Sequence, residues 1–237
     1  MATKLTQADA MKILVVSPHP DDEVLGVGGT MHRLARQGHE VTAAIVTKGW
    51  PPLFPEEQIA QVRAEAQKAN ESLGVKKVRF MDLPVTKLHA LPEHELNAAF
   101  DRLIVEESPD WVFLPFPGDR HEDHRQVYDA AMVGLRPVAA RPAVKKILCY
   151  ETVSETHWAA GGIEPSFEPQ VWIDVSEDLE AKLEAMRLYV SQVRPAPDAR
   201  SLEAVSALAA WRGSVVGMPS AEVFMLAREC LARHGRI

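Results

Sequence analysis

The sequence has little of what marks several classes of protein. Its 237 residues include only two cysteines, Cys149 and Cys230, which form no C-x-x-C pair. This spacing excludes a disulfide framework and a thiolate zinc site. No apolar run approaches the roughly 20 residues that cross a bilayer, and the first segment, Met1 to Asp9, is polar. We therefore expect a cytoplasmic protein without membrane insertion.

Positive charge is also scarce. The chain has 26 Lys and Arg against 33 Asp and Glu, a formal net charge of −7, and its basic residues form no block. Because proteins that bind nucleic acid carry a basic patch, we expect no such partner. Hydrophobic residues make up 46% and charged residues 25% of the chain, which is typical of a globular protein. We predict a single domain over residues 1–237 that binds a small molecule.

Short apolar, β-branched runs alternate with amphipathic segments as far as Glu151. The expected strands are Lys12 to Ser17, Glu40 to Thr47, Lys77 to Met81, Asp110 to Phe116 and Lys145 to Glu151. The expected helices are Gly29 to Gln37, Glu57 to Leu73, Glu93 to Glu107 and His121 to Leu135. Gly38 and Gly74 stand where C-terminal caps would end the first two helices. This alternation predicts an α/β fold with a doubly wound, mainly parallel sheet.

Beyond Glu151 the pattern becomes less regular. A strand is expected over Gln170 to Val175 and a helix over Ser176 to Gln192. The loop-rich stretches 156–169 and 193–198 are too short to be domain linkers. We interpret this part as a C-terminal extension of the same domain.

Two clusters of histidines and carboxylates each follow an apolar run. His19-Pro20-Asp21-Asp22-Glu23 follows Ile13 to Val16, and Asp119-Arg120-His121-Glu122-Asp123-His124 follows Trp111 to Leu114. In a doubly wound sheet the first strand commonly lies between the second and the fourth, and ligands bind at the carboxyl ends of strands beside that point. The topology therefore predicts that both clusters meet in one crevice.

The donor types in these clusters suit a catalytic metal. A catalytic zinc site uses three protein ligands and keeps one position open, and imidazole and carboxylate also suit ferrous iron. Such a site hydrolyses amides or esters. Each cluster alone has a plainer interpretation, because acidic residues are favoured at helix N-termini and His-x-x-His occurs on exposed helices. Their placement after two strands favours the metal site.

The run Gly26-Val27-Gly28-Gly29 resembles part of a dinucleotide-binding loop. The third glycine of that fingerprint is absent, because Met31 stands in its place. We interpret these glycines as positions where a helix packs closely against the sheet.

Taken together, these residues resemble the LmbE-like, or PIG-L-type, N-acetylglucosaminyl deacetylases. Pro18 to Glu23 matches the family signature Pro/Ala-His-Pro-Asp-Asp-Glu, and His121 to His124 matches His-x-Asp-His. Weaker family features follow in order: Arg63-x-Glu65, Leu73-Gly74-Val75, Ser191-Gln192 and Ala221-Glu222-x-Phe224. The resemblance covers most of the chain. It implies a Rossmann-like fold and a zinc-dependent hydrolase that removes the acetyl group from an N-acetylglucosamine-type substrate.

The resemblance also implies a role for each residue of the two clusters. His19, Asp22 and His124 would hold zinc, with ferrous iron as the alternative, and Asp21 would be the general base that activates water. His121, as an imidazolium oriented by Asp123, would stabilise the oxyanion. Proteins of this kind often form oligomers, so a homo-oligomer is expected.

Substrate contacts are less clearly indicated. Arg63 either pairs with a carboxylate on its own helix or, as the resemblance implies, contacts a substrate hydroxyl. Relatives often carry Leu-Pro-Asp where this chain has Leu83-Pro84-Val85, and Asp82 is the candidate replacement for the missing aspartate. Loops 48–55 and 156–169 are expected to set specificity. Two alternatives stay open: an amidase acting on a thiol conjugate or another N-acyl metabolite, and a non-catalytic carbohydrate-binding metalloprotein.

Overall fold

The computed structural model describes residues 10–138, 144–158 and 162–231. The polar segment 1–9 and residues 159–161 of the predicted specificity loop lie outside the described residues. A seven-stranded sheet runs through the molecule in the order β3-β2-β1-β4-β5-β7-β6. Its strands are β1 (Lys12–Ser17), β2 (Glu40–Lys48), β3 (Lys77–Pro84), β4 (Trp111–Pro115), β5 (Lys146–Tyr150), β6 (Val171–Asp174) and β7 (Ala221–Glu229). The first five strands are parallel, and β7 runs antiparallel to both β5 and β6. The predicted doubly wound, mainly parallel sheet is confirmed, with β1 between β2 and β4.

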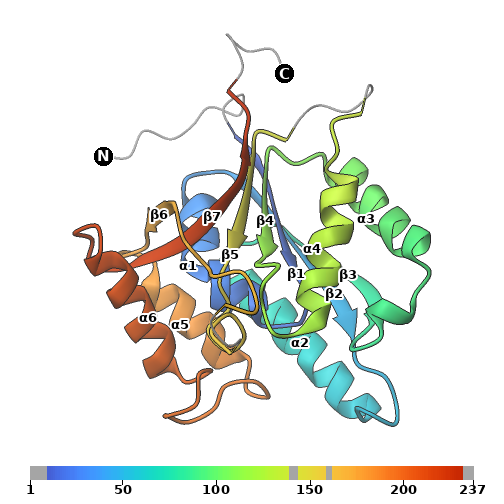
Figure 1. Cartoon of the computed structure of the whole chain (residues 1–237). Helices are drawn as coiled ribbons and strands as arrows, with labels where there is room; N and C mark the ends of the chain where they lie inside the picture. The colour runs from blue at the N-terminus through green and yellow to red at the C-terminus, as the bar shows by residue number, and fades with distance from the viewer. Residues whose placement is uncertain (1–9, 139–143, 159–161, 232–237) are drawn as a thin grey trace.

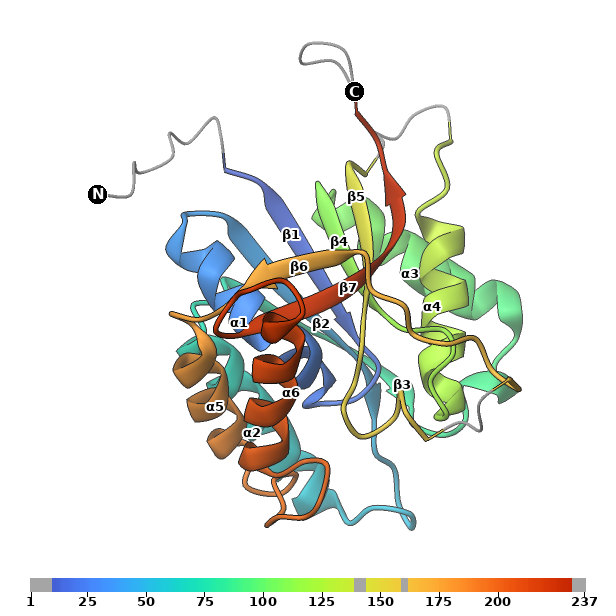
Figure 2. The same cartoon turned by 60° about the vertical axis from the view of Figure 1, so that its left-hand side comes forward.

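Helices cover both faces of this sheet (Figures 1 and 2). They are α1 (Asp22–Arg36), α2 (Glu56–Ser72), α3 (Glu93–Glu107), α4 (Glu122–Gly134), α5 (Leu179–Leu188) and α6 (Leu202–Ser214), with a short 3-10 turn η1 (Leu88–Ala90). The side chains of β1 show how the two layers are built. Ile13 and Val15 pack with α1, α2 and α5, whereas Leu14 and Val16 pack with α3 and α4. Successive side chains of a strand point to opposite faces, so a strand covered on both sides is a continuous apolar run.

The first helix begins seven residues earlier than the sequence predicts, at Asp22. Glycines lower helix propensity, so the run 26–29 points to a later start. Packing overrides that propensity: a Cβ on Gly26 would lie 2.2 Å from a ring carbon of Tyr150, and one on Gly29 would lie 2.9 Å from Val175. These glycines therefore allow α1 to lie close to β5 and to the segment after β6. Gly38 and Gly74 follow the ends of α1 and α2 with φ angles of +93° and +75°, as caps require.

The C-terminal part differs most from the sequence prediction. The helix expected over 176–192 is shorter, because Ser176 donates to Asp174 before α5 begins and Tyr189 leaves the helix at its end. Helix α6 and strand β7 were not predicted. Nevertheless the extension belongs to the same sheet, since β7 pairs with β5.

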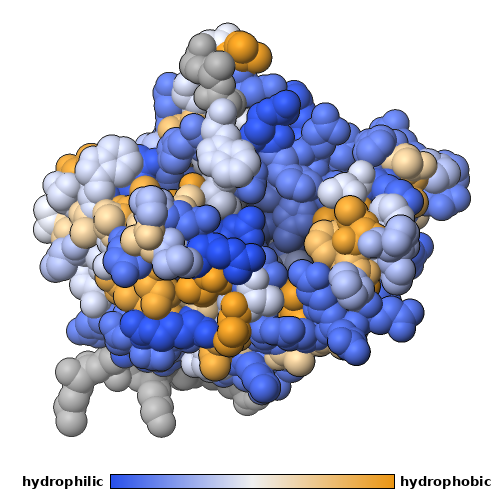
Figure 3. Space-filling view, turned by 90° about the horizontal axis from the view of Figure 1, so that it is seen from below, coloured by the Kyte–Doolittle hydropathy of each residue, from blue (hydrophilic) through white to orange (hydrophobic). Residues whose placement is uncertain are grey.

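Among the described residues, no helix is both long enough and apolar enough to span a membrane. Both cysteines are unpaired thiols; Cys149 is buried in β5 and Cys230 is half-buried. Figure 3 views the molecule from below Figure 1, the end toward which β1 and β4 run, and shows a hollow on this face.

Candidate metal centre and active site

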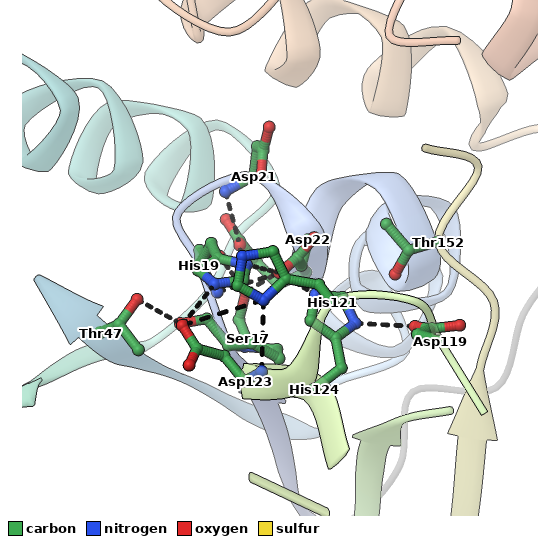
Figure 4. Close-up of polar contacts among 12 residues, drawn as sticks. Ser17, His19, Asp21, Asp22, Thr47, Asp119, His121, Asp123, His124 and Thr152 are labelled. Carbon is green, nitrogen blue, oxygen red and sulfur yellow. Dashed lines mark hydrogen bonds and ion pairs between the residues drawn. The ribbon is translucent and has the colours of Figure 1, made fainter. Parts of the chain in front are cut away.

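The two clusters meet where β1 and β4 end (Figure 4). His19 lies in the turn after β1, Asp22 is the first residue of α1, and His124 lies in the first turn of α4. One ligand atom from each of these residues lies within 4.8 Å of the others. The Oδ2 atom of Asp22 is 3.1 Å from Nδ1 of His19 and 3.2 Å from Nε2 of His124. Two imidazoles and one carboxylate therefore converge on one point.

A second possible ligand set, His19, His121 and Asp123, satisfies the same distance limit. The surrounding hydrogen bonds favour the first set. Asp119 Oδ2 lies 2.7 Å from Nδ1 of His124, and the buried Nε2 then faces Oδ2 of Asp22 at 3.2 Å without the geometry of a hydrogen bond. Asp123 Oδ2 lies 3.1 Å from Nε2 of His19, so that Nδ1 faces Asp22. Metal-binding histidines typically give their second nitrogen to a carboxylate in this way.

The charges around the two imidazoles also fit a cation. Burial lowers the pKa of His19, but the hydrogen bonds to Asp123 and Asp22 outweigh it and raise the pKa to about 9. Burial likewise lowers the pKa of His124, and the charges of Asp22 and Asp119 raise it to about 10. The carboxylates that hold protons on these imidazoles would equally hold a divalent metal there, so the residues fit such an ion.

Asp21 is held in an unusual conformation beside this centre. Its φ angle is +111°, in a region that non-glycine residues rarely adopt, and its side chain is buried. Its Oδ2 atom makes no hydrogen bond and lies 3.7 Å from Nη1 of Arg200. Burial and the neighbouring charge of Asp22 raise the pKa of Asp21 well above its usual value. A buried carboxyl of this kind lining a cavity is typical of an acid–base group.

His121 caps the N-terminus of α4, where its Nδ1 accepts the backbone N–H of Asp123 at 3.2 Å. Burial and repulsion from His19 lower the pKa of His121 to about 4. Asp123 lies closer to other groups than to this imidazole: its Oδ2 is 3.9 Å from Nδ1 of His121, but 3.1 Å from His19 and 2.8 Å from the backbone N–H of Thr86. The structure thus connects Asp123 to His19 more closely than to His121.

The weaker family features have structural roles. Glu65 accepts hydrogen bonds from the backbone N–H and the hydroxyl of Ser191. Glu222 accepts the backbone N–H groups of Gly29 and Thr30, and it pairs with the buried Lys182 at 2.6 Å. These contacts tie the C-terminal extension to α1 and α2.

Glu23 supports the turn that carries the ligands. It is fully buried and accepts hydrogen bonds from Tyr189 Oη at 2.5 Å, from Asn70 Nδ2 at 2.9 Å and from the backbone N–H of Asp21 at 3.2 Å. The turn after β1 is therefore fixed from α2 and from the end of α5.

A cavity of about 300 Å³ opens onto His19, Asp21, Asp22 and His121. Arg63 and Asp82, the two predicted substrate contacts, both line it and form an ion pair at 2.5 Å, with Arg63 also 3.9 Å above the ring of Phe80. Arg63 thus pairs with a carboxylate on β3 and not on its own helix. From the predicted loop 48–55, Lys48, Gly49 and Phe54 line the cavity. In the other predicted loop, Thr156 donates to Oδ1 of Asp119 at 2.6 Å.

Several polar residues of the cavity have no role predicted from the sequence, among them Glu155, Gln192 and Arg200. Arg200 donates to Oε1 of Gln192 at 3.1 Å. The resemblance marked Gln192 only as part of a weak motif, and Arg200 lies in a loop without any pattern. Only the folded extension brings it beside Asp21.

Known proteins resemble this chain across the same region. Residues 14–134, which include both clusters, match the family described as GlcNAc-PI de-N-acetylase, PIG-L. The chain is 30% identical over 194 residues to the diacetylchitobiose deacetylase of Thermococcus kodakarensis, with 78% of this chain and 71% of that protein covered. It is 31% identical over 194 residues to the uncharacterized deacetylase YaiS of Escherichia coli, with 79% and 95% covered. The structure matches N,N'-diacetylchitobiose deacetylase from Pyrococcus horikoshii with a TM-score of 0.73 and 26% identity, covering 92% and 84% of the two chains.

Proposed function

This chain belongs to the PIG-L, or LmbE-like, family of de-N-acetylases, and we propose that it is a zinc-dependent hydrolase that removes the acetyl group from an N-acetylglucosamine-type substrate. The products are acetate and a free amine. One observation carries this proposal: a buried carboxyl without a hydrogen bond, Asp21, stands beside a three-residue metal-ligand set at the end of one cavity. A protein that only bound carbohydrate would have no use for that carboxyl.

His19, Asp22 and His124 would hold the metal, and zinc and ferrous iron both suit these donors. Such an ion supplies Lewis-acid activation of water and of the amide carbonyl. Asp21 takes the proton from the attacking water and passes it to the leaving amine, which makes it first the general base and then the general acid. Asp119 and Asp123 keep the rings of His124 and His19 in their orientations.

His121 can stabilise the oxyanion without becoming an imidazolium. A backbone N–H can only donate, so Nδ1 of His121 must be the acceptor in its contact with Asp123. A neutral imidazole whose Nδ1 accepts carries its proton on Nε2. Burial and repulsion from His19 lower the pKa of His121 to about 4, which favours the neutral imidazole with an Nε2–H donor. A hydrogen bond from this donor would stabilise the negative oxygen that develops as water attacks.

Acetate release tests the proposal. Protein of known metal content is incubated with N-acetylglucosamine and simple N-acetylglucosaminides, with and without a chelator and added zinc. We expect the chelator to abolish acetate release and zinc to restore it. Full activity in protein stripped of metal would overturn the metal-dependent mechanism. Failure to release acetate from any of these amino sugars, at full zinc content, would overturn the substrate class.

The second candidate is an amidase that acts on a thiol conjugate or another N-acyl metabolite. Val85, at the place where relatives often carry an aspartate, favours a substrate that differs from theirs in this region. Acetate release from a panel of N-acetylated amines distinguishes the two candidates.

A further inference from the structure

The cavity has two unlike sides. One side carries two of the candidate metal ligands, His19 and Asp22, together with Asp21, His121 and Arg200. The other side is formed by the loop after β2, by α2, and by β3 with the residue that follows it. Its apolar side chains, which we call the apolar wall, are Phe54, Ile59, Val62, Phe80 and Val85. Figure 3 shows hydrophobic residues among hydrophilic ones around the hollow on this face.

The polar groups next to the apolar wall already have partners. The hydroxyl of Thr47 donates to the carbonyl of Pro18 at 2.7 Å. The backbone N–H of Val85 donates to Lys48, and its carbonyl accepts from Nε1 of Trp50 at 3.0 Å.

The charged and other polar residues on this side lie at its exposed edge. Arg63 and Asp82 pair with each other at 2.5 Å. Lys48 and Gln58 are exposed at the rim. A hydroxyl-rich group lying against the five side chains of the apolar wall would lose water and gain no hydrogen bond from them, which is unfavourable.

A second hollow continues the cavity outward on this same side. It shares Lys48, Gly49, Ile59, Arg63 and Asp82 with the cavity, and it is extended mainly by apolar residues: Trp50, Pro51, Ala60 and Pro84, with Glu56 as the one charged addition. The acyl product, acetate, is small, so a substrate that outgrows the cavity must do so through its amine component. That component would extend out of the cavity along the apolar wall, past Ile59.

We propose, resting on the proposed deacetylase function, that the amine component of the substrate carries an apolar group, alkyl or aryl, which lies on the apolar wall and reaches the second hollow. For an amino sugar this group is the aglycone. The sugar hydroxyls then face the side with Arg200, Gln192 and Glu155. Binding of the apolar group contributes through burial of apolar surface, about fourfold for each methylene fully removed from water.

The experiment compares kcat/KM for acetate release by the zinc-loaded protein across the methyl, butyl and hexyl glycosides of N-acetylglucosamine. We expect kcat/KM to rise with chain length, by about fourfold per methylene at most. In Ile59→Asn the hexyl-to-methyl ratio should fall toward one. The matched control is Val105→Asn on α3, because Val105 is 53% exposed and lies outside the cavity lining. It should leave the ratio unchanged.

Each outcome is informative. If kcat/KM for acetate release does not depend on chain length, the proposal of an apolar aglycone is wrong, whereas the proposed deacetylase function is supported. No acetate release from any glycoside at full zinc content overturns both. If Ile59→Asn does not fold, as judged by circular dichroism, Val62→Asn on the same wall replaces it, and an unchanged ratio there contradicts the proposal.

Discussion

Replacing Asp119 by Ala should weaken zinc binding although Asp119 is not one of the three ligands. Its side chain is fully buried, with Oδ2 at 2.7 Å from Nδ1 of His124 and Oδ1 at 2.6 Å from the hydroxyl of Thr156. Without Asp119, the hydrogen bond that holds the ring of His124 with Nε2 toward Asp22 is lost. Removing a carboxylate that orients a metal-binding histidine typically reduces metal affinity about 10- to 100-fold. This corresponds to about 1.4–2.7 kcal/mol of binding free energy.

The assay is a competition for zinc between the protein and a chromophoric chelator, with circular dichroism to show that the variant folds. Glu122→Ala is the matched control, since Glu122 is an exposed carboxylate in the same cluster. It removes one negative charge but no contact with His124. A Kd in Asp119→Ala equal to that of Glu122→Ala would refute the argument that the hydrogen bond to His124 fixes the ligand.

Three further predictions concern the base, the ligands and the protons. Asp21→Asn should lower kcat by about 10²- to 10⁴-fold with zinc content unchanged; metal analysis beside the acetate assay checks it, and retained activity would remove Asp21 from the mechanism. His124→Ala should lose zinc, so stoichiometric metal in that variant would contradict the ligand set. Although burial lowers both values, the carboxylates raise the pKa of His19 to about 9 and of His124 to about 10. Zinc binding at pH 7 should therefore release about two protons, measured by calorimetry in buffers of different protonation enthalpy. In the metal-free protein the two protonated imidazoles stabilise the folded state, because both pKa values are raised on folding. This stabilisation is complete below pH about 6.5 and is lost as the pH rises through 9 and 10; thermal unfolding of metal-free protein should show the loss.

Much of the fold could be predicted because its strands are covered on both sides. The apolar run Lys12–Ser17 and the helix Glu93–Glu107 have the predicted bounds. Helix α6 has no such signal: Leu202–Ser214 is rich in alanine and its apolar residues gather on no single face. Strand β7 combines buried residues with an exposed end, and its pairing with β5 and β6 defines it. In both elements tertiary contacts decide the structure, and a local pattern cannot show them.

The same distinction applies to the site. The meeting of His19, Asp21, Asp22 and His124 could be predicted, because each cluster is a short run that directly follows a strand and the strand order brings the ends of β1 and β4 together. The opposite side of the cavity could not. Arg200 and Gln192 reach the cavity from a loop whose position depends on contacts between distant residues, such as Ser191 with Glu65 and Tyr189 with Glu23.

These distant contacts share one chemistry. Glu23, Glu65 and Glu222 are buried carboxylates, and each accepts hydrogen bonds that join the C-terminal extension to the first two helices. A buried carboxylate is costly unless it is hydrogen-bonded, so each contact strongly favours the packing of the C-terminal extension against α1 and α2. Glu23 also accepts the backbone N–H of Asp21, so the same residue contacts the turn that carries Asp21 and the end of α5. The extension is therefore part of the site: it supplies one side of the cavity, and its position is linked directly to that of Asp21.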